Sequence, residues 1–238
     1  MAADEEALEL LAAAAGDHAR LEDLVARRCQ GEPLAWLTGS VTFCGERIVV
    51  KPGVYVPRWQ SEPLALEAAN RLPTDGIAVD LCTGAGALAV VIMRRKPRAQ
   101  VFATESDPTA VDCARANGVN VIFGDLTAGL VATLAGTVDV VCAVVPYVPT
   151  QEMHLLPRDV MTYEPRHALD GGPQGTEFLL RAIAEAAPLL RPRGWLLLEI
   201  GGAQGDALAS AFEANGYDDV TLAYDDEGDL RAVSARRR

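Results

Sequence analysis

A glycine-rich turn lies between an apolar segment and an alanine-rich segment, and a carboxylate follows it at an informative distance. The residues from Asp80 onward read Asp-Leu-Cys-Thr-Gly-Ala-Gly-Ala-Leu-Ala, so Gly84, Gly86 and Ala89 match the pattern G-x-G-x-x-A. Glycine has no Cβ, so a ligand can approach the backbone, and the free N–H groups of a following helix attract oxyanions. Glu105 follows roughly 20 residues later, the spacing typical of a carboxylate that binds ribose hydroxyls. These residues predict a site for a ligand that carries a ribose or a phosphate.

The segments that must position this site alternate between strand and helix patterns. We expect strands at 77–81, 100–104, 119–123, 138–144 and 194–200, with a helix from the glycine turn to about 95 and further helices at 108–116, 127–134, 175–190 and 203–214. Such alternation indicates an α/β fold with a mostly parallel sheet and helices on both faces. Two closing strands, at 219–224 and 230–235, flank a short acidic turn and predict a C-terminal antiparallel hairpin. The stretch between 144 and 175 is expected to be a loop.

The residues before the sheet read as smaller elements. We expect two amphipathic helices at 4–15 and 18–29, with Leu8 and Leu11 on the packed face of the first and Val25 on that of the second. A β-hairpin follows at 41–43 and 47–50, and then a helix at 62–71. The predicted organisation is a helical N-terminal segment at 1–39, a hairpin with a connector or lid at 40–60, and the main domain at 61–238. Trp36 and Trp59 are interpreted as core or helix-staple residues.

Composition excludes several classes of protein. The net charge of −12 argues against a general nucleic-acid surface, because phosphate binding needs clustered positive charge. The five cysteines contain no C-x-x-C pair and the three histidines have no ligand spacing, so we expect reduced thiols and no metal. No apolar run approaches the length of a membrane span, and no targeting segment is evident. We therefore expect a cytoplasmic protein.

Three features favour S-adenosylmethionine over a nicotinamide dinucleotide as the ligand. Asp80 stands at the end of the first sheet strand, before the glycines, where its carboxylate can face a cationic ligand group. Asp125 follows the third strand, where an adenine amino group needs an acceptor, and Leu126 comes next. The predicted antiparallel hairpin is absent from a plain doubly wound dehydrogenase half. A dehydrogenase stays the alternative on these residues alone.

Further motifs, in order along the chain, give a specific resemblance. They are Gly31-Glu32-Pro33 through Gly39, Val56-Pro57-Arg58 with Ser61-Glu62, the turn from Asp80 to Gly86, Glu164-Pro165, Ala168-Leu169-Asp170-Gly171-Gly172 with Gly175, Glu199-Ile200-Gly201 with Gln204, and Asp229 with Arg231. From Gly31 nearly to its end, the chain resembles the HemK/PrmC family of protein glutamine N5-methyltransferases, which modify a loop of translation release factors. It is particularly similar to a shorter branch of that family whose protein substrate is unassigned.

The resemblance implies a Rossmann-like class I methyltransferase fold, S-adenosylmethionine as the cofactor and a glutamine-bearing protein loop as the substrate. It places the cofactor against the residues Arg58, Asp80, Thr83, Gly84, Gly86, Glu105, Asp125 and Leu126. Arg58 would order a lid by pairing with a carboxylate such as Glu62, and Glu164 and His167 would flank the site. No direct contact with nucleic acid or membrane is expected.

The family's N-P-P-Y acceptor motif falls on Val144-Val145-Pro146-Tyr147, and there the sequence departs from the family. In the family the asparagine side chain and the next backbone carbonyl orient the substrate amide, whereas Val144 offers no hydrogen-bond acceptor. The carbonyl of Val145, the rigid ring of Pro146 and the aromatic ring of Tyr147 are retained. The departure leaves three hypotheses open: a glutamine methyltransferase, a methyltransferase with another acceptor, and a protein that binds the cofactor without turnover.

Overall fold

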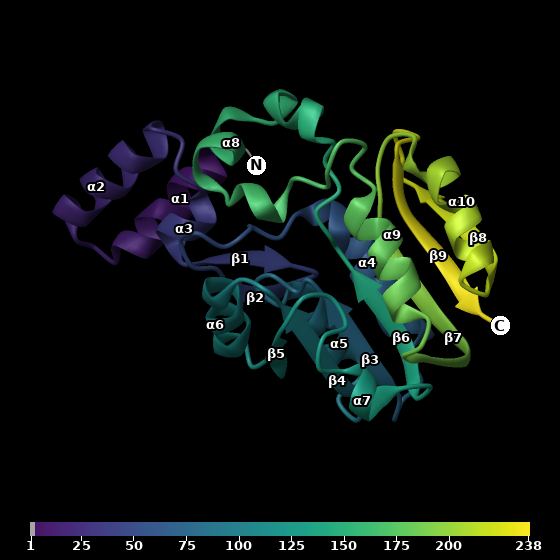
Figure 1. Ribbon diagram of the computed structural model, residues 1–238. Helices are drawn as coiled ribbons and strands as arrows, with labels where there is room; N and C mark the ends of the chain where they lie inside the picture. Colours follow the sequence, from purple (N-terminus) through teal and green to yellow (C-terminus); the bar gives the residue numbers. More distant parts are fainter. Residues whose placement is uncertain (1–2) are drawn as a thin grey trace.

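The computed structural model describes residues 3–238, and a twisted sheet forms its centre (Figure 1). Within the described residues the sheet has seven strands in the order β5-β4-β3-β6-β7-β9-β8. The strands are β3 (Ile77–Leu81), β4 (Gln100–Glu105), β5 (Val121–Phe123), β6 (Val138–Ala143), β7 (Leu190–Glu199), β8 (Tyr217–Tyr224) and β9 (Leu230–Arg237). The first five are parallel to one another, and β9 pairs antiparallel with both β7 and β8. The predicted α/β fold with a closing hairpin is confirmed.

Helices cover both faces of this sheet because each strand of its centre is apolar on both sides. One buried cluster joins the sheet to α4 (Glu62–Arg71), α5 (Ala87–Arg95) and α6 (Pro108–Ala116). A second cluster joins the opposite face to α7 (Val131–Leu134), α9 (Glu177–Ala186) and α10 (Gln204–Ala214). Every residue of β6 except Asp139 is buried, as expected of a strand covered on both faces. The helices expected at 127–134 and 175–190 are shorter than the sequence pattern predicts.

The strand order places the carboxyl ends of β3 and β6 at the point where the chain reverses its direction across the sheet. From β3 the chain proceeds through β4 to β5, and it then returns to the other side of β3 to form β6 and β7. Ligands of open α/β sheets bind outside the strand ends at such a switch point, because the connecting loops diverge there. The glycine turn follows β3 and the Val144–Tyr147 segment follows β6, so the fold brings both predicted motifs to this place.

The N-terminal helices pack differently from the sequence expectation. Helices α1 (Ala3–Ala14) and α2 (His18–Cys29) form at the expected positions, but α1 buries Leu10 and Ala14, while Leu8 and Leu11 are exposed. Val25 of α2 is also exposed. The face was misassigned because alanine and leucine occur all around α1, so its amphipathic pattern is weak. Helix α3 (Leu34–Thr38) then leads into the hairpin of β1 (Ser40–Phe43) and β2 (Glu46–Val49).

The stretch expected to be one loop contains helical turns that lie above the carboxyl ends of the strands (Figure 1). These are η2 (Thr150–Leu155), α8 (Arg158–Tyr163) and η3 (Arg166–Ala168). The Tyr163 hydroxyl donates a hydrogen bond to the backbone carbonyl of Gln30, and its ring packs edge-on against Trp36 at 6.3 Å between centroids. Helix α8 therefore rests on the N-terminal segment.

Candidate functional site

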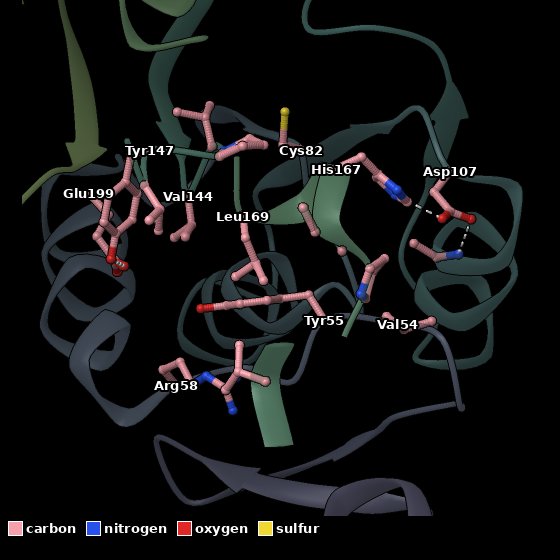
Figure 2. Close-up of a pocket in the computed structure, with 18 of the residues that line it drawn as sticks. Val54, Tyr55, Arg58, Cys82, Asp107, Val144, Tyr147, His167, Leu169 and Glu199 are labelled. Carbon is pink, nitrogen blue, oxygen red and sulfur yellow. Dashed lines mark hydrogen bonds and ion pairs between the residues drawn. The ribbon is translucent and has the colours of Figure 1, made fainter. Parts of the chain in front are cut away.

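A cavity of about 570 Å³ lies at the carboxyl ends of β3, β4 and β6 (Figure 2). Its volume is in the range of sites that hold small-molecule ligands. Figure 2 shows His167 and Asp107 at one end of the cavity and Tyr147 and Glu199 at the other, with Val144 near the latter pair. The cavity thus has two ends, built from different strands.

The glycine turn shapes the wall of the cavity that follows β3. Gly84 has a φ of +57°, and no atom lies within 4 Å of the position that a Cβ would occupy there. Gly86 has a φ of +88° and begins α5, but a Cβ at that residue would collide with Val119 at 2.8 Å. Gly84 therefore leaves open space for a ligand, whereas Gly86 allows the helix to pack against its neighbour.

Glu105 stands at the end of β4, beside this turn. One carboxylate oxygen accepts a hydrogen bond from the backbone N–H of Gly84 at 2.9 Å. The other accepts from the N–H groups of Ser106 and Asp107 at 2.7 and 2.9 Å. An ionised carboxylate offers about four acceptor positions, so three are used and one is left on the oxygen next to Gly84. That position suits a ribose hydroxyl, which agrees with the role predicted for Glu105.

Asp80 lies behind the glycine turn and does not line the cavity. Its carboxylate accepts a hydrogen bond from the Thr83 hydroxyl at 2.5 Å and another from the backbone N–H of Ala89 at 3.2 Å. Burial raises the pKa of Asp80 to about 7, against the opposing effect of these two donors. The geometry makes Asp80 a support for the turn, and its direct contact with a cofactor stays a prediction.

The remaining predicted cofactor residues are divided between the cavity and the layer behind it. Asp125 lines the cavity and forms an ion pair with Arg181 of α9 at 2.8 Å. Leu126 is buried in the second apolar cluster, with Thr83 and Gly86 also outside the cavity lining. Of the eight predicted cofactor residues, the structure brings four to the cavity wall: Arg58, Gly84, Glu105 and Asp125.

Arg58 pairs with Glu164, and not with Glu62 as expected. The Arg58 guanidinium donates to the Glu164 carboxylate, which also accepts from the backbone N–H of Val56 at 3.2 Å. The Glu164 side chain is 1% exposed, and its burial raises its pKa against the opposing effect of Arg58. Glu62 is turned away and accepts from the N–H of Cys44 at 2.8 Å. Proximity in sequence misled the expectation, because Glu164 reaches Arg58 only through the fold.

The four residues of the predicted acceptor segment, Val144, Val145, Pro146 and Tyr147, all line the cavity. The Tyr147 hydroxyl donates a hydrogen bond to one oxygen of the Glu199 carboxylate at 2.9 Å. The other oxygen of Glu199 is buried without a hydrogen-bond partner in the described part of the chain. Burial raises the pKa of Glu199, while the hydroxyls of Ser61 and Tyr147 act in the opposite direction. This end of the cavity is therefore aromatic and apolar, with one weakly solvated carboxyl group.

The glycine-rich segment 171–175 packs against the backbone of the acceptor segment. A Cβ on Gly171 would lie 2.7 Å from both the Pro146 carbonyl oxygen and the Tyr147 Cα, so only glycine allows this approach. The Gln204 side-chain amide donates to the carbonyl of Tyr147 at 2.8 Å. The glycines and Gln204 noted in the sequence thus act by fixing the backbone on which the acceptor segment depends.

Several cavity residues had no role predicted from the sequence. Tyr55 lies in the connector next to the Val56-Pro57-Arg58 motif, with the Arg58 guanidinium 5.1 Å from its ring centroid. Asp107 pairs with the His167 imidazole at 3.0 Å. Tyr55 was detectable by its position beside that motif, whereas the pairing of Asp107 has no signal in the sequence. His167 lines the cavity as expected.

Trp59 is not a core residue, contrary to expectation. It lines the cavity and is nevertheless 69% exposed, whereas Trp36 is buried and donates to the carbonyl of Val54 at 3.0 Å. Among residues 3–238, no helix is long and apolar enough to cross a membrane. The same described range holds no cluster of three or more histidine, cysteine or acidic side chains arranged for a metal ion.

Comparisons with known proteins agree with this geometry. Residues 61–134 match the family model of the methyltransferase small domain. The release factor glutamine methyltransferase of Geobacter sulfurreducens is 37% identical over 90% of this chain and 76% of its own length. The enzyme of the same description from Mycolicibacterium smegmatis is 39% identical over 92% of this chain and 80% of its own length. A methyltransferase structure from Pyrococcus furiosus has a TM-score of 0.59 and 21% identity, covering 82% of this chain and 90% of that one, which supports the fold.

Proposed function

Because this chain belongs to the release factor glutamine methyltransferase family, we propose that it methylates the side-chain amide nitrogen of a glutamine in a translation release factor. The chain is an S-adenosylmethionine-dependent methyltransferase. The observation that carries the proposal is the single cavity that joins the glycine turn and Glu105 to the segment Val144–Tyr147. One end holds a nucleoside and the other receives a methyl acceptor, so the two can meet.

The residues at the first end fit S-adenosylmethionine. Gly84 leaves the space that a Cβ would fill, and Glu105 keeps one acceptor position for a ribose hydroxyl. Asp125 can accept from the adenine amino group, because its ion pair with Arg181 occupies only one of about four acceptor positions on the carboxylate. When bound, the cofactor supplies an electrophilic methyl group on a sulfonium sulfur.

The residues at the second end must orient the acceptor amide. An amide nitrogen is a weak nucleophile because its lone pair is delocalised, so orientation matters greatly and can contribute about 7 to 11 kcal/mol to lowering a barrier. The Val145 carbonyl can accept a hydrogen bond from the amide, while the rings of Pro146 and Tyr147 limit its movement. Tyr147 is itself fixed by Glu199, and its backbone is fixed by Gln204.

A purified release factor and labelled S-adenosylmethionine test this proposal directly. We expect the label on a glutamine side chain, located by mass spectrometry of the digested substrate, and no label when that glutamine is replaced by alanine. Label on another residue type would contradict the proposed acceptor while leaving methyl transfer intact.

Val144 favours one second candidate, a methyltransferase that acts on another nucleophile. Valine cannot accept a hydrogen bond from an amide, and it makes this end of the cavity more apolar. Methylation of proteins in a cell lysate, followed by identification of the labelled residue, distinguishes the two candidates. We place the reaction in the cytoplasm, where release factors act and where the five free thiols stay reduced.

A further inference from the structure

Trp59 stands at the opening of the cavity, where most of its side chain is exposed. A side chain that lines a cavity and is 69% exposed must lie at its rim. It follows Arg58 directly, and the ion pair between Arg58 and Glu164 fixes the backbone on which Trp59 is carried. Large aromatic residues are unfavourable in water at such exposure, and tryptophan is enriched at the centres of protein interfaces.

Helix α8 supplies another part of the cavity wall. Asp159 and Val160 line the same cavity as Trp59, although they come from a distant part of the chain. The Asp159 carboxylate accepts a hydrogen bond from the backbone N–H of Val160. Arg28, the cation whose charge interacts with Asp159, forms its ion pair with Glu6 at 2.9 Å. The exposed side chains of Leu155 and Met161 flank this stretch. The wall of the cavity thus combines the exposed indole of Trp59, the apolar side chain of Val160 and the carboxylate of Asp159, while Leu155 and Met161 lie outside the lining.

The charged side chains that line the cavity are mostly acidic. Five carboxylates line it (Glu105, Asp107, Asp125, Asp159 and Glu199) against two arginines, Arg58 and Arg231. Both arginines are paired with carboxylates outside the lining, Glu164 for Arg58 and Asp225 for Arg231. Among the carboxylates, Asp125 is paired with Arg181 outside the lining and Asp107 with His167 inside it, so the excess of negative charge rests on the other three. With a net charge of −12 on the chain, the surroundings attract cations.

We propose that Trp59, with Asp159, forms a docking site at the cavity rim for a lysine- or arginine-bearing polypeptide segment that flanks the methylated glutamine. The proposal rests on the function proposed above. When a glutamine side chain enters the cavity, the polypeptide on both sides of that glutamine must pass over the rim. A cationic side chain there can stack on the indole face of Trp59, and the carboxylate of Asp159 adds to the negative potential that attracts it to the cavity.

The test uses the full chain and two synthetic glutamine peptides, one with lysines and one with glutamates on both sides of the glutamine. We expect the lysine peptide to change the tryptophan emission of the parent, and we expect this change to be absent from Trp59→Phe. Trp59→Ala should raise KM for the lysine peptide about threefold to tenfold, with kcat and the cofactor Kd unchanged. Asp159→Asn should weaken binding of the same peptide, and added salt should weaken it further.

Tyr224→Ala is the matched control, because Tyr224 is 59% exposed on β8 and does not line the cavity. Its kinetics should equal those of the parent. If the parent methylates both peptides equally well and Trp59→Ala does not differ from it, the docking site is refuted and the proposed function stands. If no peptide is methylated but the lysine peptide alone gives the Trp59 signal, the docking site stands and the acceptor is wrong. If neither methylation nor binding occurs, both proposals fail.

Discussion

Replacing Val144 by asparagine restores an amide-orienting group at the acceptor end of the cavity. Val144 is half-buried and packs against the first apolar cluster, so an asparagine there points partly into the cavity. Its side-chain oxygen can accept from the substrate amide beside the Val145 carbonyl. One well-oriented hydrogen bond to the transition state is worth about 1.4 to 3 kcal/mol, or about tenfold to a hundredfold in rate.

The same substitution has a cost in stability, which gives it a second signature. Full burial of a valine side chain stabilises a protein by roughly 1.5 to 3 kcal/mol, so the half-buried Val144 contributes about 1 kcal/mol. For a chain of this length the loss lowers Tm by roughly 2 to 4 °C. We therefore expect Val144→Asn to be slightly less stable and much more active on glutamine, two effects of opposite sign.

The assay is transfer of labelled methyl to a release factor under single-turnover conditions, with Tm measured in parallel. Val144→Leu is the control, because leucine keeps the site apolar and should not increase the rate. Equal rates for the parent and Val144→Asn, with the parent already methylating glutamine efficiently, would refute the reasoning. The Val145 carbonyl and Tyr147 would then suffice to orient the amide.

Three further predictions concern Glu105, the ion pair between Arg58 and Glu164, and Asp80. Glu105→Ala should weaken S-adenosylmethionine binding by roughly 1.5 to 3 kcal/mol in calorimetry, because it removes a ribose acceptor; unchanged affinity would place Glu105 outside the site. Arg58→Ala should cost roughly 3 to 5 kcal/mol of unfolding free energy by leaving Glu164 buried and unpaired, and adding Glu164→Gln should recover part of that loss in a double-mutant cycle. Burial raises the pKa of Asp80 to about 7, above its unfolded value, so its ionisation favours the unfolded chain. Stability relative to Asp80→Asn should therefore fall as pH rises from about 4 to 7, and a constant difference in denaturant titrations over that range would contradict the assigned pKa.

The sequence predicted the sheet well because each strand carries its own apolar pattern. Both the glycine turn and Glu105 were found from local spacing, since the two residues are fixed relative to successive strands of one βαβ unit. The Arg58–Glu164 pair could not be predicted, because its partners are 106 residues apart and their approach depends on the loop after β6. Trp59 was misassigned for a related reason: exposure depends on what the rest of the fold leaves uncovered, and no local pattern encodes it.

The arrangement of the cavity also bears on how such an enzyme changes over evolutionary time. Gly84 follows β3 and Glu105 ends β4, whereas Val144 and Tyr147 follow β6, with separate supports behind each pair. A substitution after β6 can alter the nucleophile that fits without disturbing the ribose contacts. The two specificities can therefore drift independently, and a valine at position 144 is the kind of step by which a new acceptor becomes accessible while the cofactor stays the same.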